Sequence, residues 1–170
     1  MKKIIFVLIA SILLTCISFS MSETPPDKSS LGQKAAKIMV ENLAGKKFDL
    51  SKTKGKVVFL NFWATWCPPC RSEMPSIQKL FQNIKDDKFE IVAISLDDSP
   101  EKPREFARSN NFTFPIYFDR DKSAAKKYNI RGIPATFIID KKGEIAFQHI
   151  GSRDWASQDM LIKIKALVKY

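Results

Sequence analysis

Apolar residues fall into short blocks along this chain, and the length and period of each block predict an element. Residues 57–63 and 89–96 are almost unbroken apolar runs, too short for a typical helix and typical of strands that are buried on both faces. Between them, apolar side chains recur with the helical period from Pro68 to Ile84. The same criteria predict helices over 100–111, 122–128 and 154–169, and strands over 115–118, 135–140 and 144–149.

The order of these elements predicts the fold class. Strands and helices alternate up to about residue 128, and a hairpin around Lys141-Lys142-Gly143 and a last helix follow. Residues 37–50 are a second hairpin candidate. We therefore expect an α/β fold with one core: a central mixed β-sheet flanked by helices, with an N-terminal β-hairpin. We expect the last helix to bury four apolar side chains, Trp155, Leu161, Ile164 and Val168.

The first 22 residues differ in character from the rest of the chain. Lys2 and Lys3 precede an apolar run over 4–17, which is shorter than the roughly 20 residues that a membrane-spanning helix needs. The pattern predicts a signal peptide, with three outcomes open: cleavage within 18–22, lipidation of Cys16, or an uncut N-terminal membrane anchor. In each case we expect an exported protein, periplasmic or on the extracytoplasmic face of the membrane.

Residues 23–35 are polar and contain prolines, with nothing to bury, so we expect a flexible linker that leads into a domain over 36–170. The chain has a net charge of +10. Its lysines are scattered rather than set on a stripe with interleaved aromatic residues, which argues against a nucleic-acid partner. The basic balance favours a solvated surface instead.

Only two cysteines lie beyond the predicted signal segment, Cys67 and Cys70, in the sequence Cys-Pro-Pro-Cys. Closing so short a loop constrains the unfolded chain very little, so we interpret the pair as chemical rather than stabilising. At the junction of a buried strand and a helix, Cys67 is favoured as thiolate nucleophile, and Cys70, one turn into the helix, can resolve a mixed disulfide. We expect no metal, because beyond the predicted signal segment His149 is the only other potential zinc ligand of the Cys or His type.

The segment 62–75 reads Phe-Trp-Ala-Thr-Trp-Cys-Pro-Pro-Cys-Arg-Ser-Glu-Met-Pro. It resembles the active site of the TlpA/ResA/CcmG-like group of exported thioredoxin-like proteins. The resemblance extends over about 36–170 and includes Leu-Ala-Gly-Lys at 43–46, Glu-Ile-Val-Ala-Ile-Ser at 90–95 and Gly-Ile-Pro-Ala-Thr-Phe at 132–137. It implies a thioredoxin fold with a central insertion, here about 97–128, and thiol:disulfide oxidoreductase activity that needs no cofactor.

The resemblance also implies a substrate-binding surface. Pro134 matches the cis-proline of the group, and a cis bond there makes a tight turn that exposes the backbone of Ile133 for pairing with a substrate. A purely structural turn is the alternative. We expect the residues beside the cysteines to contact substrate as well, namely Trp66, Pro68 and Pro69.

Glu73, three residues after Cys70, matches a carboxylate that tunes the thiols in this group. Its implied role is to accept the proton of Cys70 as that thiol attacks the mixed disulfide. Asn61 stands where typical thioredoxins bury an aspartate. An amide cannot take up that proton, which leaves Glu73 or water as the acceptor.

The resemblance implies a monomeric disulfide reductase. It would receive electrons from a membrane electron donor of the thiol-disulfide type and pass them to exported client proteins with disulfides, for example apocytochrome c. An oxidant or isomerase of folding proteins stays open, because the Pro-Pro dipeptide does not settle the redox direction. A peroxiredoxin shares the fold, although a Cys-Pro-Pro-Cys pair suits dithiol exchange better. A binding module or chaperone without turnover is the alternative outside the enzymes.

Overall fold

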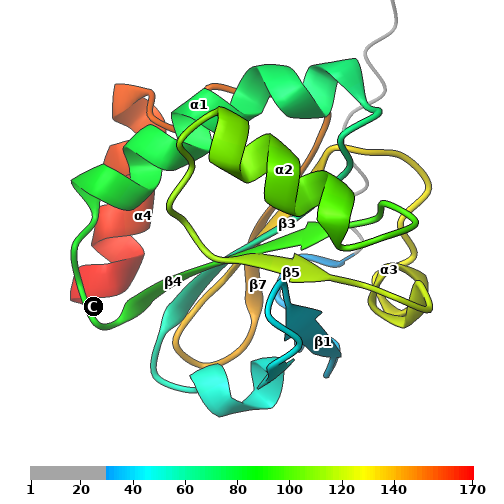
Figure 1. Ribbon diagram of the computed structural model, residues 1–170. Helices are drawn as coiled ribbons and strands as arrows, with labels where there is room; N and C mark the ends of the chain where they lie inside the picture. The colour runs from blue at the N-terminus through cyan, green and yellow to red at the C-terminus, as the bar shows by residue number, and fades with distance from the viewer. Residues whose placement is uncertain (1–29) are drawn as a thin grey trace, which may run out of the picture.

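The computed structural model describes residues 30–170; the predicted signal segment 1–22 and the linker residues 23–29 lie outside the described residues. The strands and helices form one unit, with a single mixed sheet between layers of helices (Figure 1). The strands are β1 (Met39–Asn42), β2 (Lys47–Asp49), β3 (Val57–Trp63), β4 (Phe89–Ser95), β5 (Ile116–Phe118), β6 (Ala135–Ile139) and β7 (Ile145–Ile150). The helices are α1 (Pro68–Asn83), α2 (Glu101–Ser109), α3 (Ser123–Lys127) and α4 (Gln158–Lys169), and a short 3₁₀ turn covers Leu50–Thr53.

Strand β3 runs through the middle of the sheet, whose order is β2-β1-β5-β4-β3-β6-β7. It pairs in parallel with β4 and antiparallel with β6, and all of its residues are buried. Successive side chains face opposite sides of a strand. Accordingly, Phe59 and Trp63 enter the core under α1 and α4, while Leu60 and Phe62 enter the core on the α3 side. The predicted α/β class, with a mixed sheet flanked by helices, is confirmed.

Helix α1 begins directly after Cys67, whose extended backbone forms the N-cap. Pro68 occupies the first helical position, where the missing N–H of proline costs no hydrogen bond. The helix continues through Pro75, and its buried face carries Met74, Ile77 and Leu80. Among residues 30–170, no helix is long and apolar enough to cross a membrane.

The segment between β4 and β6 forms the predicted insertion, which consists of α2, β5 and α3. Strand β5 pairs in parallel with β4 and antiparallel with β1. Strands β1 and β2 form the predicted N-terminal hairpin. The insertion and the hairpin therefore extend the sheet together, on the side away from β6 and β7.

Helix α4 starts four residues later than predicted, at Gln158 instead of residue 154. Ser157 is its N-cap with extended backbone, and the N–H of Ser157 donates to the carbonyl of Asp154, so this segment is a turn. Trp155 is buried as expected, but from the turn and not from the helix. Leu161 is only half-buried, because Met160 takes the inward position.

The end of the predicted linker is hydrogen-bonded to the domain. The N–H of Gly32 donates to the carbonyl of Ile145 at 2.9 Å, and that of Ala35 to the carbonyl of Gly143 at 2.9 Å. Lys34 also forms an ion pair of 2.9 Å with Glu144. Residues 30–35 therefore lie against the start of β7 and the turn that precedes it.

Two isoleucines of α4 provide a matched test of the core. Ile164 is fully buried, whereas Ile162, on the same helix, is 61% exposed. We expect Ile164→Ala to lower the free energy of unfolding by about 2–5 kcal/mol, since it leaves a cavity under the sheet. Ile162→Ala should change it by less than about 0.5 kcal/mol. Urea unfolding measures both, and equal effects would contradict this packing of α4.

Candidate active site

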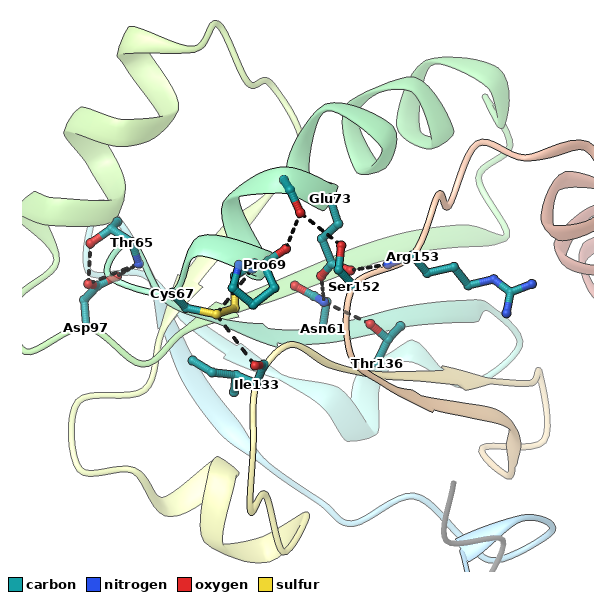
Figure 2. The surroundings of a disulfide bond; sticks show 12 residues. Asn61, Thr65, Cys67, Pro69, Glu73, Asp97, Ile133, Thr136, Ser152 and Arg153 are labelled. Atoms are coloured by element: carbon teal, nitrogen blue, oxygen red, sulfur yellow. Dashed lines mark hydrogen bonds between the residues drawn. A yellow bond between two sulfur atoms is a disulfide. The ribbon is translucent and has the colours of Figure 1, made fainter. Parts of the chain in front are cut away.

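Cys67 and Cys70 form a disulfide across the first turn of α1, with their Cα atoms 5.3 Å apart (Figure 2). The two cysteines differ in access: Cys67 is 4% exposed and Cys70 is 0% exposed. Cys67 is therefore the more accessible of the two, whereas Cys70 is fully enclosed. This asymmetry agrees with Cys67 as nucleophile and Cys70 as resolving residue.

The position of Cys67 at the start of α1 favours a thiolate. Its Sγ accepts a hydrogen bond from the N–H of Cys70 at 3.3 Å. The first N–H groups of a helix have no carbonyl partner within the helix, and together with the helix dipole they stabilise an anion placed there. A sulfur at this position is a better nucleophile at neutral pH because more of it is ionised.

The loop before β6 lies against the cysteine pair. Its Ile133–Pro134 peptide bond is cis, as the resemblance implied. The carbonyl oxygen of Ile133 is 3.6 Å from the Sγ of Cys67. In the disulfide this sulfur carries no hydrogen, so the approach is a contact, and in the dithiol the Cys67 thiol can donate to that oxygen. Pro134 is buried and Ile133 is half-buried.

An apolar rim surrounds the sulfur of Cys67. Trp66 is 62% exposed, and Pro68 and Pro69 are exposed beside it. Ile133 approaches from the other side, so the fold brings together segments about 65 residues apart in the chain. These residues are placed to meet a client, and their role in substrate binding stays a prediction.

Sequence reasoning missed Asp97, a buried carboxylate two residues after the end of β4. Its oxygens accept from the N–H of Thr65 at 3.1 Å, the hydroxyl of Thr65 at 2.6 Å and the hydroxyl of Ser95 at 2.8 Å. Thr65 lies two residues before Cys67, so this carboxylate fixes the loop that presents the nucleophile (Figure 2). The signal was an aspartate at the end of a strand that runs parallel to β3.

Glu73 is 1% exposed and lies one turn after Cys70 on α1. Its carboxylate accepts three hydrogen bonds: from Asn61 Nδ2 at 2.9 Å, from Trp155 Nε1 at 2.9 Å and from the N–H of Arg153 at 3.3 Å. Burial nevertheless raises the pKa of Glu73 from 4.5 to about 7, because the three donors only partly replace lost hydration. The carboxyl can therefore take up and release a proton near neutral pH.

Asn61 contacts Glu73 directly (Figure 2). The same Nδ2 group donates to the hydroxyl of Thr136 on β6 at 2.9 Å. Asn61 thus donates hydrogen bonds at the position where typical thioredoxins have an aspartate. The group that titrates beside it is Glu73. The sequence pointed to Asn61 and Glu73 separately, and the tertiary structure joins them.

Sequence reasoning assigned Trp155 to the core and gave Arg153 no role. Both contact Glu73 from the turn before α4. The available signal was chemical, since a buried indole N–H usually finds an acceptor. His149 is half-buried, and its ring lies 5.8 Å from that of Trp155. Within 30–170, no group of three or more His, Cys, Asp or Glu residues is placed to hold a metal ion.

This chain is similar in sequence and in structure to known thiol-disulfide oxidoreductases. The sequence profile of the AhpC/TSA family matches residues 31–148. The thiol-disulfide oxidoreductase ResA of Bacillus thuringiensis is 35% identical over 142 residues, which cover 82% of each chain. The thioredoxin-like protein YneN of Bacillus subtilis is 44% identical over 124 residues, or 71% of this chain and 72% of its own. A thioredoxin-family thiol:disulfide interchange protein of Chlorobium tepidum has a similar structure, with a TM-score of 0.69 and 27% identity over 79% of this chain and 95% of that one.

The buried carboxyl of Glu73 makes stability depend on pH. Between pH 4.5 and about 7 the folded chain holds a proton on Glu73 that the unfolded chain has released, so the free energy of unfolding falls as pH rises through this window. The full pKa difference between the folded and the unfolded chain corresponds to about 3 kcal/mol in the free energy of unfolding. We expect Glu73→Gln to remove this part of the pH dependence in urea unfolding from pH 4.5 to 7.5.

Glu105→Gln is the matched control, because Glu105 is an exposed glutamate on α2. It should keep the slope of the unaltered protein. An unchanged slope in Glu73→Gln would mean that the carboxyl of Glu73 is ionised in the folded chain throughout this range.

Proposed function

We propose that this chain reduces disulfides of selected proteins outside the cytoplasm. The chain belongs to the AhpC/TSA family, and it is a thiol:disulfide oxidoreductase of the ResA-like, thioredoxin-fold group. One observation carries the proposal: a cysteine at a helix N-terminus, the more accessible of the pair, is backed by a fully enclosed cysteine that is one turn from a buried carboxyl. This arrangement provides a nucleophile, a resolving thiol and a proton acceptor in that order.

The reaction proceeds in two exchange steps. In the dithiol form, the thiolate of Cys67 attacks one sulfur of the client disulfide, forms a mixed disulfide and releases the other client sulfur as a thiolate, which takes up a proton. Cys70 then loses its proton and attacks the Sγ of Cys67, which releases the second client thiol. Two electrons pass to the client, and the Cys67–Cys70 disulfide remains.

Glu73 is the proposed acceptor for the proton of Cys70. Residues three apart on a helix are neighbours on its surface, and both side chains are buried on the same side of α1. A base works best when its pKa lies near the working pH, and the pKa of Glu73 is about 7. The proton can leave again by way of water once the client has dissociated.

The surface around Cys67 supports a protein client. The exposed ring of Trp66 and the exposed Pro68 and Pro69 form an apolar rim beside the sulfur. An extended peptide segment can lie on this rim and pair with the backbone near Ile133. Clients with a cysteine in an unfolded or extended segment, such as the haem-binding cysteines of apocytochrome c, have this chemistry.

Each turnover leaves the cysteine pair oxidised, so the protein needs a reductant. A membrane electron donor of the thiol-disulfide type meets this need by the same exchange chemistry at Cys67. The basic start and apolar run of the first 22 residues support export or anchoring at the outer face of the membrane. The close spacing of Cys67 and Cys70 favours dithiol exchange over reduction of peroxides.

Trapping of the mixed disulfide tests the roles of the two cysteines. In a chain that also carries Cys16→Ser, Cys70→Ser should accumulate a covalent adduct with an oxidised Cys-Xaa-Xaa-Cys-His peptide, because the resolving thiol is absent. Cys67→Ser should form no adduct, since Cys70 is buried. Mass spectrometry of the adduct identifies the linked cysteine. No adduct in either variant, together with unchanged binding of the peptide by Cys67→Ser, would instead support a binding module without thiol chemistry.

The reduction potential of the Cys67/Cys70 couple tests the direction of the reaction. We expect a value at or below about −230 mV, in the range of thioredoxin and glutaredoxins, because a reductant must hold its electrons less tightly than its clients. Equilibration in graded thiol buffers with quantification of free thiol gives this value. A potential near about −120 mV, where strong oxidants of folding proteins lie, would reverse the direction.

A further inference from the structure

The turn between β7 and α4, residues 151–155, contacts both halves of the active site. At one end, the N–H of Gly151 donates to the carbonyl of Pro134 at 2.8 Å. At the other end, the N–H of Trp155 donates to the hydroxyl of Ser76 on α1 at 3.0 Å, and that hydroxyl is 3.3 Å from the carbonyl of Arg153. This turn, which we name the 151–155 bridge, therefore connects the cis-proline loop to the helix that carries the cysteines.

Three rings fix the indole of Trp155 in one orientation. The ring of Phe59 on β3 meets it edge-on, with centroids 4.9 Å apart and planes at 80°. The rings of Phe147 and His149 on β7 also stand nearly perpendicular to it, at 87° and 81°. A fully buried indole held in this way has little freedom to rotate. Its Nε1 points at the carboxylate of Glu73, 2.9 Å away.

We propose that Trp155 is a positioning residue for the thiol-disulfide reaction, and that its indole N–H holds the carboxyl of Glu73 in place beside Cys70. The proposal rests on the role proposed above for Glu73. It assigns to the 151–155 bridge a function in the chemistry as well as in packing, because the same turn also supplies the N–H of Arg153 to this carboxylate.

Packing alone does not account for this hydrogen bond. Trp63 is a second fully buried tryptophan in the same core, and its Nε1 has no hydrogen-bond partner within the described part of the chain. The core therefore accommodates an indole N–H without a partner. At Trp155 the N–H is directed instead to a carboxylate, where a hydrogen bond to the charged form is strongest.

Neutral donors dominate the surroundings of Glu73. From the 151–155 bridge, the guanidinium of Arg153 turns away to Asp159 at 2.8 Å, and the exposed Asp154 accepts from the N–H of Ala156. On β7, the ring of His149 stands edge-on to the indole of Trp155, with centroids 5.8 Å apart. On α1, Arg71 is exposed, and the two cysteines titrate only when reduced. Asn61 on β3 and Thr136 on β6 carry no charge.

The test compares Trp155→Phe with Trp63→Phe in the full chain. Both substitutions shrink a fully buried indole, but only the first removes a donor to Glu73. Carbon-13 NMR of the side-chain carboxyls follows the titration of Glu73 in the oxidised protein, where neither cysteine ionises. Because the lost hydrogen bond favours the charged carboxylate, we expect Trp155→Phe to raise this midpoint by about one pH unit or more. Trp63→Phe should leave it in place.

The same two variants are then assayed as reductases across pH. We expect the rise in activity that reports ionised Glu73 to move to higher pH in Trp155→Phe by the same amount as the NMR midpoint, and not to move in Trp63→Phe. In a Glu73→Gln background, Trp155→Phe should produce no further change in the pH profile. An unmoved Glu73 midpoint in a folded Trp155→Phe protein would overturn the proposal.

Two further readouts separate this proposal from the role of Glu73 itself. If Trp155→Phe moves the midpoint but Glu73→Gln keeps full activity at every pH, the positioning contact stands and the proton-acceptor role fails. If Trp155→Phe does not fold, nitrogen-15 NMR of the unaltered protein decides. The indole N–H signal of Trp155 should shift with the Glu73 midpoint and that of Trp63 should not, and a Trp155 signal that ignores pH would refute the contact.

Discussion

The burial of β3 on both faces is the constraint on which the rest of this structure depends. A strand with no exposed side chain must lie inside the sheet, and here it pairs with β4 on one side and β6 on the other. Its end, the start of β6 and the end of β4 then meet at one edge of the sheet. Cys67, Pro134 and Asp97 lie at those three places, so the active site follows from the pairing of three strands.

The second constraint is the desolvation of Glu73. A carboxyl with 1% exposure is disfavoured in its charged form, and three hydrogen-bond donors compensate only in part, which leaves its pKa at about 7. The same imbalance that lowers stability at neutral pH produces a group able to exchange protons there. The site thus combines a helix-capping cysteine at the more accessible end with a fully enclosed resolving cysteine and a buried base, all within two turns of α1.

Most groups that hold the site in place come from outside the cysteine motif. Asp97 anchors the loop before Cys67 through Thr65, and the 151–155 bridge connects the cis-proline loop with α1. These contacts are directional hydrogen bonds that involve backbone groups and buried side chains. The family resemblance therefore identifies the reacting sulfurs, while the supporting contacts are seen only in the tertiary structure.

Local patterns in the amino-acid sequence were sufficient for the element order, the sheet class, the cysteine pair and the position of Cys67 at the start of a helix, because each depends on neighbouring residues. They failed at the start of α4, where residues 154–157 form a hydrogen-bonded turn and the helix begins only at Gln158. They also did not identify Asp97 or Trp155 as part of the site. Those roles depend on which distant segments the sheet brings together, and on how burial outweighs hydrogen bonding at Glu73, and only the packed tertiary structure decides either.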